Sequence, residues 1–109
     1  MKGMTLREIC LSTDVTRRAV QGYERAGLVS ASGKNERGYL LYDEYSQERI
    51  KKIRFFQQLG FTVKEIKDVI DAPGDVLKAA IEERLEKLKE EKSQMEYLIN
   101  KAYELIETL

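Results

Sequence analysis

One stretch decides the fold of this chain: Val15-Thr16-Arg17-Arg18-Ala19-Val20-Gln21-Gly22-Tyr23-Glu24-Arg25-Ala26-Gly27-Leu28. Thr16 is expected to begin a helix, because a threonine hydroxyl at the N-cap accepts a hydrogen bond from a first-turn amide. Gly27 is expected to end it, since glycine tolerates the positive φ of the residue that follows a helix. Side chains at helical spacing give the helix two faces: Ala19, Val20 and Tyr23 inward, and Arg17, Arg18, Gln21 and Arg25 outward. The stretch therefore predicts a surface helix with a basic outer side.

A shorter helix is expected before this stretch. Thr5 and Glu8 form a capping box, in which the threonine hydroxyl accepts from the amide of residue 8 and the glutamate reaches back to the cap. The helix is predicted to end near Leu11, because Ser12-Thr13-Asp14 has the composition of a turn. Two short helices joined by a tight turn form a helix-turn-helix, whose second helix fits the major groove of DNA.

A hairpin and a third helix are expected to follow. The only β-like runs are Leu28-Val29 and Tyr39-Leu40-Leu41-Tyr42, and the polar, glycine-bearing segment 32–38 between them is typical of a hairpin tip. Asp43 is expected to cap a helix that reaches about Leu59. A hairpin after a helix-turn-helix predicts the winged form of that motif.

A fourth helix, begun by a capping box of Thr62 and Glu65, leads to the one chain break that we predict, at Ala72-Pro73-Gly74. From Asp75 to Leu109 no glycine or proline intervenes, which predicts a helix of about 52 Å. Its apolar side chains follow a heptad, with Leu85, Ile99 and Ile106 at a positions and Ile81, Leu88, Met95, Ala102 and Leu109 at d positions. Lys92 occupies a central a position, where it either sets the alignment of a coil or extends to solvent. Because a lone helix would leave this stripe in water, we predict a dimerisation helix.

Composition excludes most catalytic and metal-binding chemistry. The 109 residues include no histidine and one cysteine, Cys10, so no Cys/His zinc site, intramolecular disulfide or imidazole-dependent catalysis can form within one chain. No apolar run approaches the roughly 20 residues that span a bilayer, and Met1-Lys2-Gly3-Met4 does not resemble a signal peptide. We therefore predict a cytoplasmic protein that is not an enzyme, has no metal or cofactor and does not bind membranes.

Charge is divided unevenly along the chain, although the formal net charge is zero. Residues 1–70 hold thirteen Lys/Arg and nine Asp/Glu, whereas residues 71–109 hold six and ten. The first segment is thus basic by four charges and the second acidic by four. This asymmetry is typical of a nucleic-acid-binding head joined to an acidic stalk.

With these elements placed, the sequence resembles the MerR family of transcription regulators. The resemblance is carried by the segments Val15-Thr16-x-Arg18-x-Val20-x-x-Tyr23-Glu24-Arg25-x-Gly27-Leu28, Gly38-Tyr39-x-x-Tyr42 and Leu59-Gly60-Phe61-x-x-x-Glu65-Ile66. It implies a mainly α fold: a winged helix-turn-helix DNA-binding domain with a small β-hairpin wing over residues 1–72, then a long antiparallel coiled-coil dimerisation helix over residues 73–109. It also implies a homodimer that binds a pseudo-palindromic promoter and alters transcription by RNA polymerase through distortion of the DNA.

The expected DNA-binding residues lie on the second helix, the wing and the third helix. They are Thr16, Arg17, Arg18, Gln21, Tyr23, Lys34, Arg37, Tyr39, Tyr42 and Arg54. Arg18 matches the family's recognition-helix arginine, and Arg54 matches a basic position in its second, helical wing. The ring of Tyr23 packs inward whether or not its hydroxyl reaches a phosphate. Tyr39 and Tyr42 are an odd number of residues apart, so strand alternation predicts that only one of them touches DNA.

Three positions depart from the family pattern, and they keep other functions open. Gln21 stands where the family usually has arginine, Gly22 where it has tyrosine, and Leu40 where the wing has arginine. Each change removes a phosphate partner, which predicts weaker or differently specific DNA binding. One alternative is a protein-interaction module on a winged-helix scaffold. Another is the DNA-binding half of a longer effector-binding regulator, because the heptad continues to the last residue.

Overall fold

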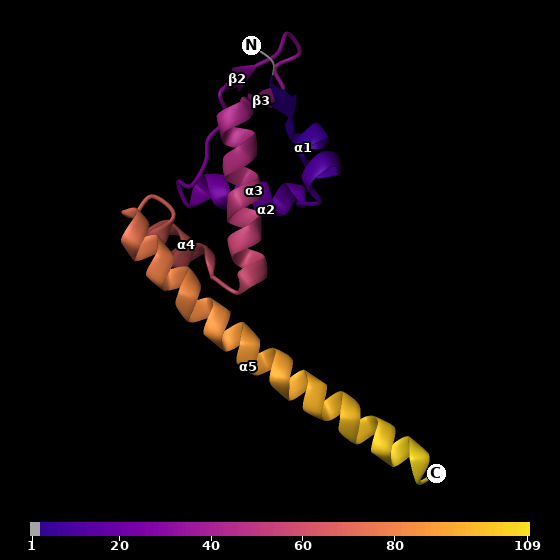
Figure 1. Ribbon diagram of the computed structural model, residues 1–109. Helices are drawn as coiled ribbons and strands as arrows, with labels where there is room; N and C mark the ends of the chain where they lie inside the picture. Colours follow the sequence, from indigo (N-terminus) through magenta and orange to yellow (C-terminus); the bar gives the residue numbers. More distant parts are fainter. Residues whose placement is uncertain (1–2) are drawn as a thin grey trace. The chain divides into compact units, whose positions relative to one another are not determined.

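The computed structural model describes residues 3–109, which divide into two compact units, Met1–Asp71 and Ala72–Leu109 (Figure 1). The first unit, called the head below, contains strands β1 (Met4–Thr5), β2 (Gly33–Lys34) and β3 (Leu40–Tyr42). Its helices are α1 (Leu6–Thr13), α2 (Arg17–Arg25), α3 (Glu44–Leu59) and α4 (Val63–Val69). The second unit contains the single helix α5 (Gly74–Glu107). The predicted mainly helical chain, with a helix-turn-helix, a hairpin and a long last helix, is confirmed.

The predicted caps position the helix-turn-helix. The Thr5 hydroxyl accepts from the Glu8 amide at 3.3 Å, and the Glu8 carboxylate accepts from the Thr5 amide at 3.2 Å. The Thr16 hydroxyl accepts from the Ala19 amide at 3.0 Å and begins α2. Asp43 and Thr62 cap α3 and α4 in the same way, so that each helix of the head begins at the residue that the sequence indicates.

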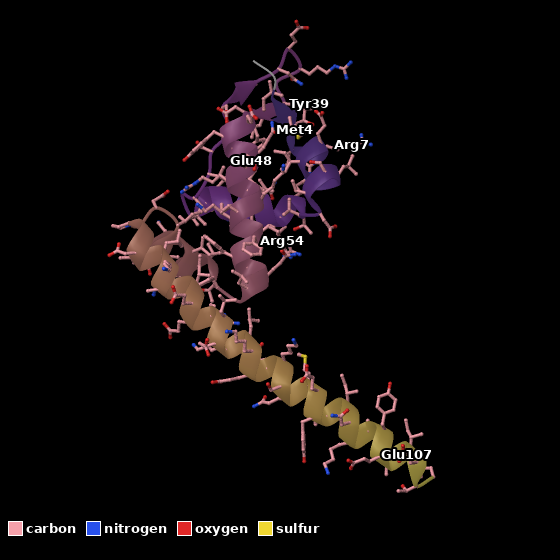
Figure 2. All side chains as sticks on the ribbon, in the orientation of Figure 1. Met4, Arg7, Tyr39, Glu48, Arg54 and Glu107 are labelled. Carbon is pink, nitrogen blue, oxygen red and sulfur yellow. The ribbon has the colours of Figure 1, made fainter. Side chains whose placement is uncertain are left out.

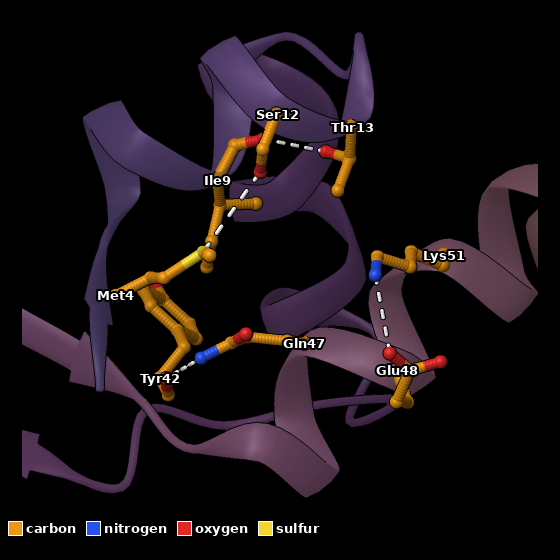
Figure 3. A network of polar contacts seen from close by, with 8 residues as sticks. All are labelled: Met4, Ile9, Ser12, Thr13, Tyr42, Gln47, Glu48 and Lys51. Atoms are coloured by element: carbon orange, nitrogen blue, oxygen red, sulfur yellow. Dashed lines mark hydrogen bonds and ion pairs between the residues drawn. The ribbon is translucent and has the colours of Figure 1, made fainter. Parts of the chain in front are cut away.

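The first helix is longer than predicted, and the turn after it is correspondingly shorter. Ser12 and Thr13 belong to α1 rather than to the turn. Their hydroxyls donate to the Ile9 carbonyl at 3.3 Å and 2.6 Å, so both polar side chains find an acceptor inside the last turn of the helix (Figure 3). The chain reverses at Asp14, which has a positive φ of 56°.

Two glycines end α2 and α3 with the same hydrogen bonds. After α2, Gly27 has φ 77°, and the amide of Leu28 donates to the Tyr23 carbonyl at 2.9 Å. After α3, Gly60 has φ 109°, and the amide of Phe61 donates to the Phe56 carbonyl at 3.0 Å. A bond from an amide to the carbonyl five residues earlier is typical of the Schellman motif. The motif favours glycine because its left-handed position strains other residues.

The sheet differs from the prediction in two strands. Its order is β1-β3-β2 with both pairs antiparallel, and Met4 pairs with Tyr42 while Gly33 pairs with Leu41. The prediction that Leu28-Val29 forms a strand is wrong: both side chains are buried in irregular chain, so their hydrophobicity reflects the core. The strand β1 was not predicted, since it is two residues long and overlaps the cap of α1.

The wing comprises β2, β3 and the loop between them, and one side chain holds that loop. The Asn35 side-chain oxygen accepts from the amides of Arg37 at 2.9 Å and Tyr39 at 3.0 Å. The side-chain amide of Gln47 in α3 donates to the Tyr42 carbonyl at 2.8 Å and ties β3 to the helix (Figure 3). The wing therefore projects from a base that is fixed to α3.

One core unites the helices of the head. Its buried apolar side chains are Ile9, Val15, Val20, Tyr23, Leu28, Val29, Tyr42, Ile50, Ile53, Phe56, Phe61, Ile66 and Ile70. The rings of Phe56 and Phe61 pack edge to face with centroids 5.8 Å apart, across the Gly60 turn. Helices α2, α3 and α4 supply six of these thirteen residues, and their buried sides set their outward faces as well.

Arg49 of α3 links two distant segments of the head. Its Nε donates to the Leu28 carbonyl at 2.6 Å, and its two Nη atoms donate to the Asp71 carboxylate at 2.8 Å and 2.7 Å. The hydrogen bonds from Arg49 lower the pKa of Asp71, although the Asp71 side chain is 70% exposed. Arg49 thus holds the exit of α2 and the last residue of the head against α3.

We predict that the two partners of this link contribute unequally to stability. Arg49→Met should lower the free energy of unfolding by about 1–3 kcal/mol at pH 7, because a half-buried charged donor to a carbonyl is lost. Asp71→Asn should cost less than about 1 kcal/mol, since the ion pair is exposed to solvent.

The contribution of Asp71 should also depend on pH. Because folding lowers its pKa, the stabilisation is present above the pKa of an ordinary carboxyl group and is lost as the pH falls through the folded value. Urea unfolding at pH 7 and pH 3 should therefore show the wild type and Asp71→Asn converging in acid. An equal difference at both pH values would contradict the assignment.

Candidate nucleic-acid interface

The outer face of α2 is basic and unengaged. Arg17, Arg18, Gln21 and Arg25 are all exposed, whereas Val20 and Tyr23 on the opposite side are buried. Among residues 3–109, the side chains of Arg17, Arg18 and Gln21 form no hydrogen bond or ion pair with the protein. The hydroxyl of Thr16, by contrast, is occupied by the helix cap. This face offers cationic and amide donors to an external partner.

Two of the predicted DNA-binding tyrosines lie in the core. Tyr23 and Tyr42 are each 1% exposed, so neither ring has a surface to present to DNA. The Tyr23 hydroxyl donates to the Gln57 side-chain oxygen at 2.5 Å, and the Tyr42 hydroxyl donates to the Glu24 carboxylate. Burial raises the pKa of both hydroxyls, and the bond to Glu24 raises that of Tyr42 further. We therefore assign both tyrosines to the positioning of α2 and omit them from the interface.

Arg54 lies beside the Tyr23 anchor. Its charge lowers the pKa of Tyr23 against the larger opposing effect of burial. The Nε of Arg54 is buried and has no hydrogen-bond partner among residues 3–109. Figure 2 shows Arg54 on the helix α3, in the part of the head that also carries α2. A buried donor without an acceptor is costly. Because this atom is closed to solvent, only the rest of the half-buried Arg54 guanidinium is available to an external anion.

The wing presents two cations at its tip. Lys34 and Arg37 are exposed, and their side chains have no partner in the part of the chain that the structure describes. Tyr39 is 58% exposed while Tyr42 is buried, as strand alternation predicts for an odd separation. Only Tyr39 remains available for contact.

An open groove joins the wing to α2. It has a volume of about 590 Å³ and is lined by Thr5, Leu6, Arg7, Arg17, Gln21, Gly38, Tyr39 and Leu40. Sequence reasoning identified Arg17, Gln21 and Tyr39 but not Arg7, which Figure 2 labels near Tyr39. Arg7 follows the predicted Thr5 cap and faces outward from α1, and that position was the signal available for finding it.

The heptad face of α5 is uncovered in one chain. None of its residues is buried, and Leu85, Met95, Ile99, Ile106 and Leu109 are more than 40% exposed. Ile81 and Leu88 are half-buried, and Lys92 and Ala102 are exposed. Ion pairs such as Lys87 with Glu83 lie along the same helix. The predicted dimerisation set thus forms an apolar stripe that lacks a cover within the protomer.

Two other kinds of site were sought in residues 3–109. No cluster of three or more histidine, cysteine, aspartate or glutamate side chains is arranged to hold a metal ion. None of the helices in these residues combines the length and the apolar character needed to cross a membrane.

We predict that the two wing tyrosines differ in their effect on stability. Tyr42→Phe removes a buried hydroxyl and leaves Glu24 without its donor, so the free energy of unfolding should fall by about 1–2 kcal/mol. Tyr39→Phe is the matched control and should change it by less than about 0.5 kcal/mol, because that hydroxyl is on the surface. Urea denaturation of both variants tests this, and equal losses would show that the Tyr42–Glu24 bond contributes no more than a surface hydroxyl.

Two models of known protein families match the chain, and they overlap over residues 47–73. Residues 4–73 match the model of the MerR HTH family regulatory proteins, and residues 47–109 match a model described as MerR, DNA binding. The HTH-type transcriptional activator mta of Bacillus subtilis (strain 168) is 31% identical over 94 residues, which are 86% of this chain and 37% of mta. Nodulation protein NolA of Bradyrhizobium sp. (strain NC92) is 38% identical over 64 residues, 59% of this chain and 27% of NolA. The chain therefore spans about a third of the length of these relatives.

Solved structures share the fold. The N-terminal part of the Bacillus subtilis multidrug transporter activator, MtaN, superposes with a TM-score of 0.70 and 28% identity, covering 94% of this chain and 97% of that one. A MerR-family transcriptional regulator from Bacillus cereus gives a TM-score of 0.72 at 25% identity, covering 91% and 76%. HiNmlR, a MerR-family regulator solved bound to promoter DNA, gives 0.76 at 13% identity, covering 91% and 80%, and this likeness concerns the fold alone.

Proposed function

Because this chain belongs to the MerR family of helix-turn-helix regulatory proteins, which are transcription regulators and not enzymes, we propose that it binds a promoter sequence specifically as a homodimer. The observation that carries the proposal is the basic outer face of α2, whose donors have no partner in residues 3–109. A helix of this kind fits the major groove, which displays a distinct donor and acceptor pattern for each base pair. The protein would act in the cytoplasm, on double-stranded promoter DNA.

The roles of the residues follow from their positions on the head. Arg18 and Gln21 lie one turn apart on the exposed face of α2 and are the candidates for contact with base edges. Arg17 at the first turn of that helix, the wing cations Lys34 and Arg37, and Arg54 of α3 are the candidates for phosphates. Phosphate contacts fix the orientation of the head, and the base contacts supply the specificity.

The uncovered stripe of α5 supports a homodimer. A helix of 34 residues with no buried side chain exposes apolar area that water disfavours, and a second copy covers it with an identical stripe. We infer an antiparallel pair, the arrangement that the resemblance to the MerR family implies. A two-fold dimer presents two α2 helices, which suits a pseudo-palindromic site.

The regulatory effect is proposed to come from deformation of the DNA. Two heads joined by a stiff coil fix the separation of their half-sites, and DNA whose natural spacing differs must bend or twist to fit both. Such a change realigns promoter elements for RNA polymerase. Activation and repression are both compatible with this mechanism, since each depends on the starting geometry of the promoter.

We predict that Arg18 is required for specific binding. Fluorescence anisotropy with DNA from upstream of the protein's own gene should show binding that weakens steeply with salt and resists competition by random DNA. Arg18→Ala should weaken it roughly 10- to 100-fold and reduce the preference over random DNA, because a base contact is lost. Lys87→Ala, on the outer side of α5, is the control for loss of one charge. Equal affinity of the wild type for random and upstream DNA would contradict the proposal.

We predict that the heptad stripe holds the dimer. Leu88→Asp places a charge in the apolar stripe and should convert the protein to a monomer in sedimentation equilibrium at micromolar concentration. Lys87→Asp introduces the same side chain at the neighbouring position, on the ion-paired flank of the helix, and should leave the dimer intact. A monomeric wild type, or a dimeric Leu88→Asp variant, would rule out this interface.

A second candidate function is a protein-interaction module. It is favoured by Leu40, an apolar wing residue that is 39% exposed in the groove, and by the neutral Gln21. The salt dependence of binding separates the two functions, since phosphate contacts release counterions whereas apolar contacts do not.

A further inference from the structure

We propose that Arg7 of α1 is a further phosphate-binding residue, which together with Arg17 grips the DNA strand that passes between α2 and the wing. The inference rests on the proposed function, which places α2 in a major groove, and it adds that the wing enters the adjacent minor groove. It assigns a role to a residue outside the recognition helix and the wing.

The argument begins with the geometry of DNA. A major groove and the minor groove beside it are separated by a single sugar-phosphate strand. A protein with one element in each groove must therefore straddle that strand, and the surface between the two elements faces it. In this protein that surface is the open groove between α2 and β3, with α1 along one side.

The lining of the groove suits a phosphate strand. It contains two cations, Arg7 and Arg17, and no acidic residue. The neighbouring Glu8 is engaged elsewhere, since its carboxylate accepts from the Thr5 amide at 3.2 Å and from the Thr5 hydroxyl at 3.1 Å. Neither arginine forms an ion pair within residues 3–109, so both guanidinium groups are free to bind an anion. Arginine binds phosphate through paired donors in a planar fork.

The wing side of the groove explains why α1 must contribute. The wing supplies Gly38, Tyr39 and Leu40 to the lining, and none of these carries a charge. Leu6, Tyr39 and Leu40 instead offer apolar surface, which can pack against the deoxyribose of the same strand. The positive charge in the groove comes only from the helices, and half of it is Arg7. The cations at the wing tip, Lys34 and Arg37, lie outside the lining.

The test compares three variants by their salt dependence. Arg7→Gln removes the charge, Arg7→Lys keeps it, and Lys87→Gln removes one from α5 as the matched control. Each phosphate contact contributes about 0.9 to the slope of log affinity against log salt, so Arg7→Gln should lower the slope of a dimer by about 1.8. Raising the salt from 0.05 M to 0.2 M weakens binding of both proteins. The factor by which it weakens should be about 12-fold smaller for Arg7→Gln than for the wild type.

The outcomes separate this inference from the proposed function. Arg7→Lys and Lys87→Gln should keep the wild-type slope, and unfolding curves should be unchanged because Arg7 is exposed. If Arg7→Gln keeps the wild-type slope while Arg18→Ala loses binding, the groove assignment is wrong and the regulator stands. If Arg7→Lys lowers the salt slope as much as Arg7→Gln does, a positive charge at residue 7 is not what binds the phosphate. The assignment is then wrong as well. A wild type that shows no binding to any DNA overturns both.

Discussion

The division of α2 into a buried side and a charged side is the constraint on which the rest of the head depends. Two buried hydroxyls hold the helix in place: Tyr23 bonds to Gln57 of α3, and Tyr42 of β3 bonds to Glu24. Both hydroxyls are buried and their acceptors are half-buried, so an unpaired hydroxyl there would be costly. These two bonds fix the orientation of α2 about its own axis. In that orientation its arginines point outward.

The same anchoring sets the relation between α2 and the wing. Tyr42 ends β3, and the Gln47 side chain secures its carbonyl to α3, so the base of the wing and the recognition helix share one support. Asn35 then restricts the loop above that base. Rigid placement of both elements allows the groove between them to have a fixed lining. A loose wing would hold no defined distance from α2.

Much of this architecture could be predicted from the sequence, for identifiable physical reasons. Caps and glycine stops are local, so Thr5, Thr16 and Gly27 were assigned correctly to helix ends. One error came where a tertiary property overrides local composition: Leu28 and Val29 are apolar because they are buried in the core. The other came from composition itself, since α1 continues through Ser12 and Thr13, whose hydroxyls bond to the Ile9 carbonyl one turn back. The site was predicted in part. A family motif indicates which residues are near DNA but not whether a given tyrosine is buried, and no motif includes Arg7.

The central claim is that two heads, joined by α5, each place α2 and the wing on either side of one DNA strand. Hydroxyl-radical footprinting of the wild-type protein on DNA upstream of its own gene tests this most directly, because it reads protection of the backbone at single nucleotides. The account predicts two protected regions related by two-fold symmetry, each including the strand between a major groove and its adjacent minor groove. A single protected region, or protection spread evenly along the DNA, would contradict it.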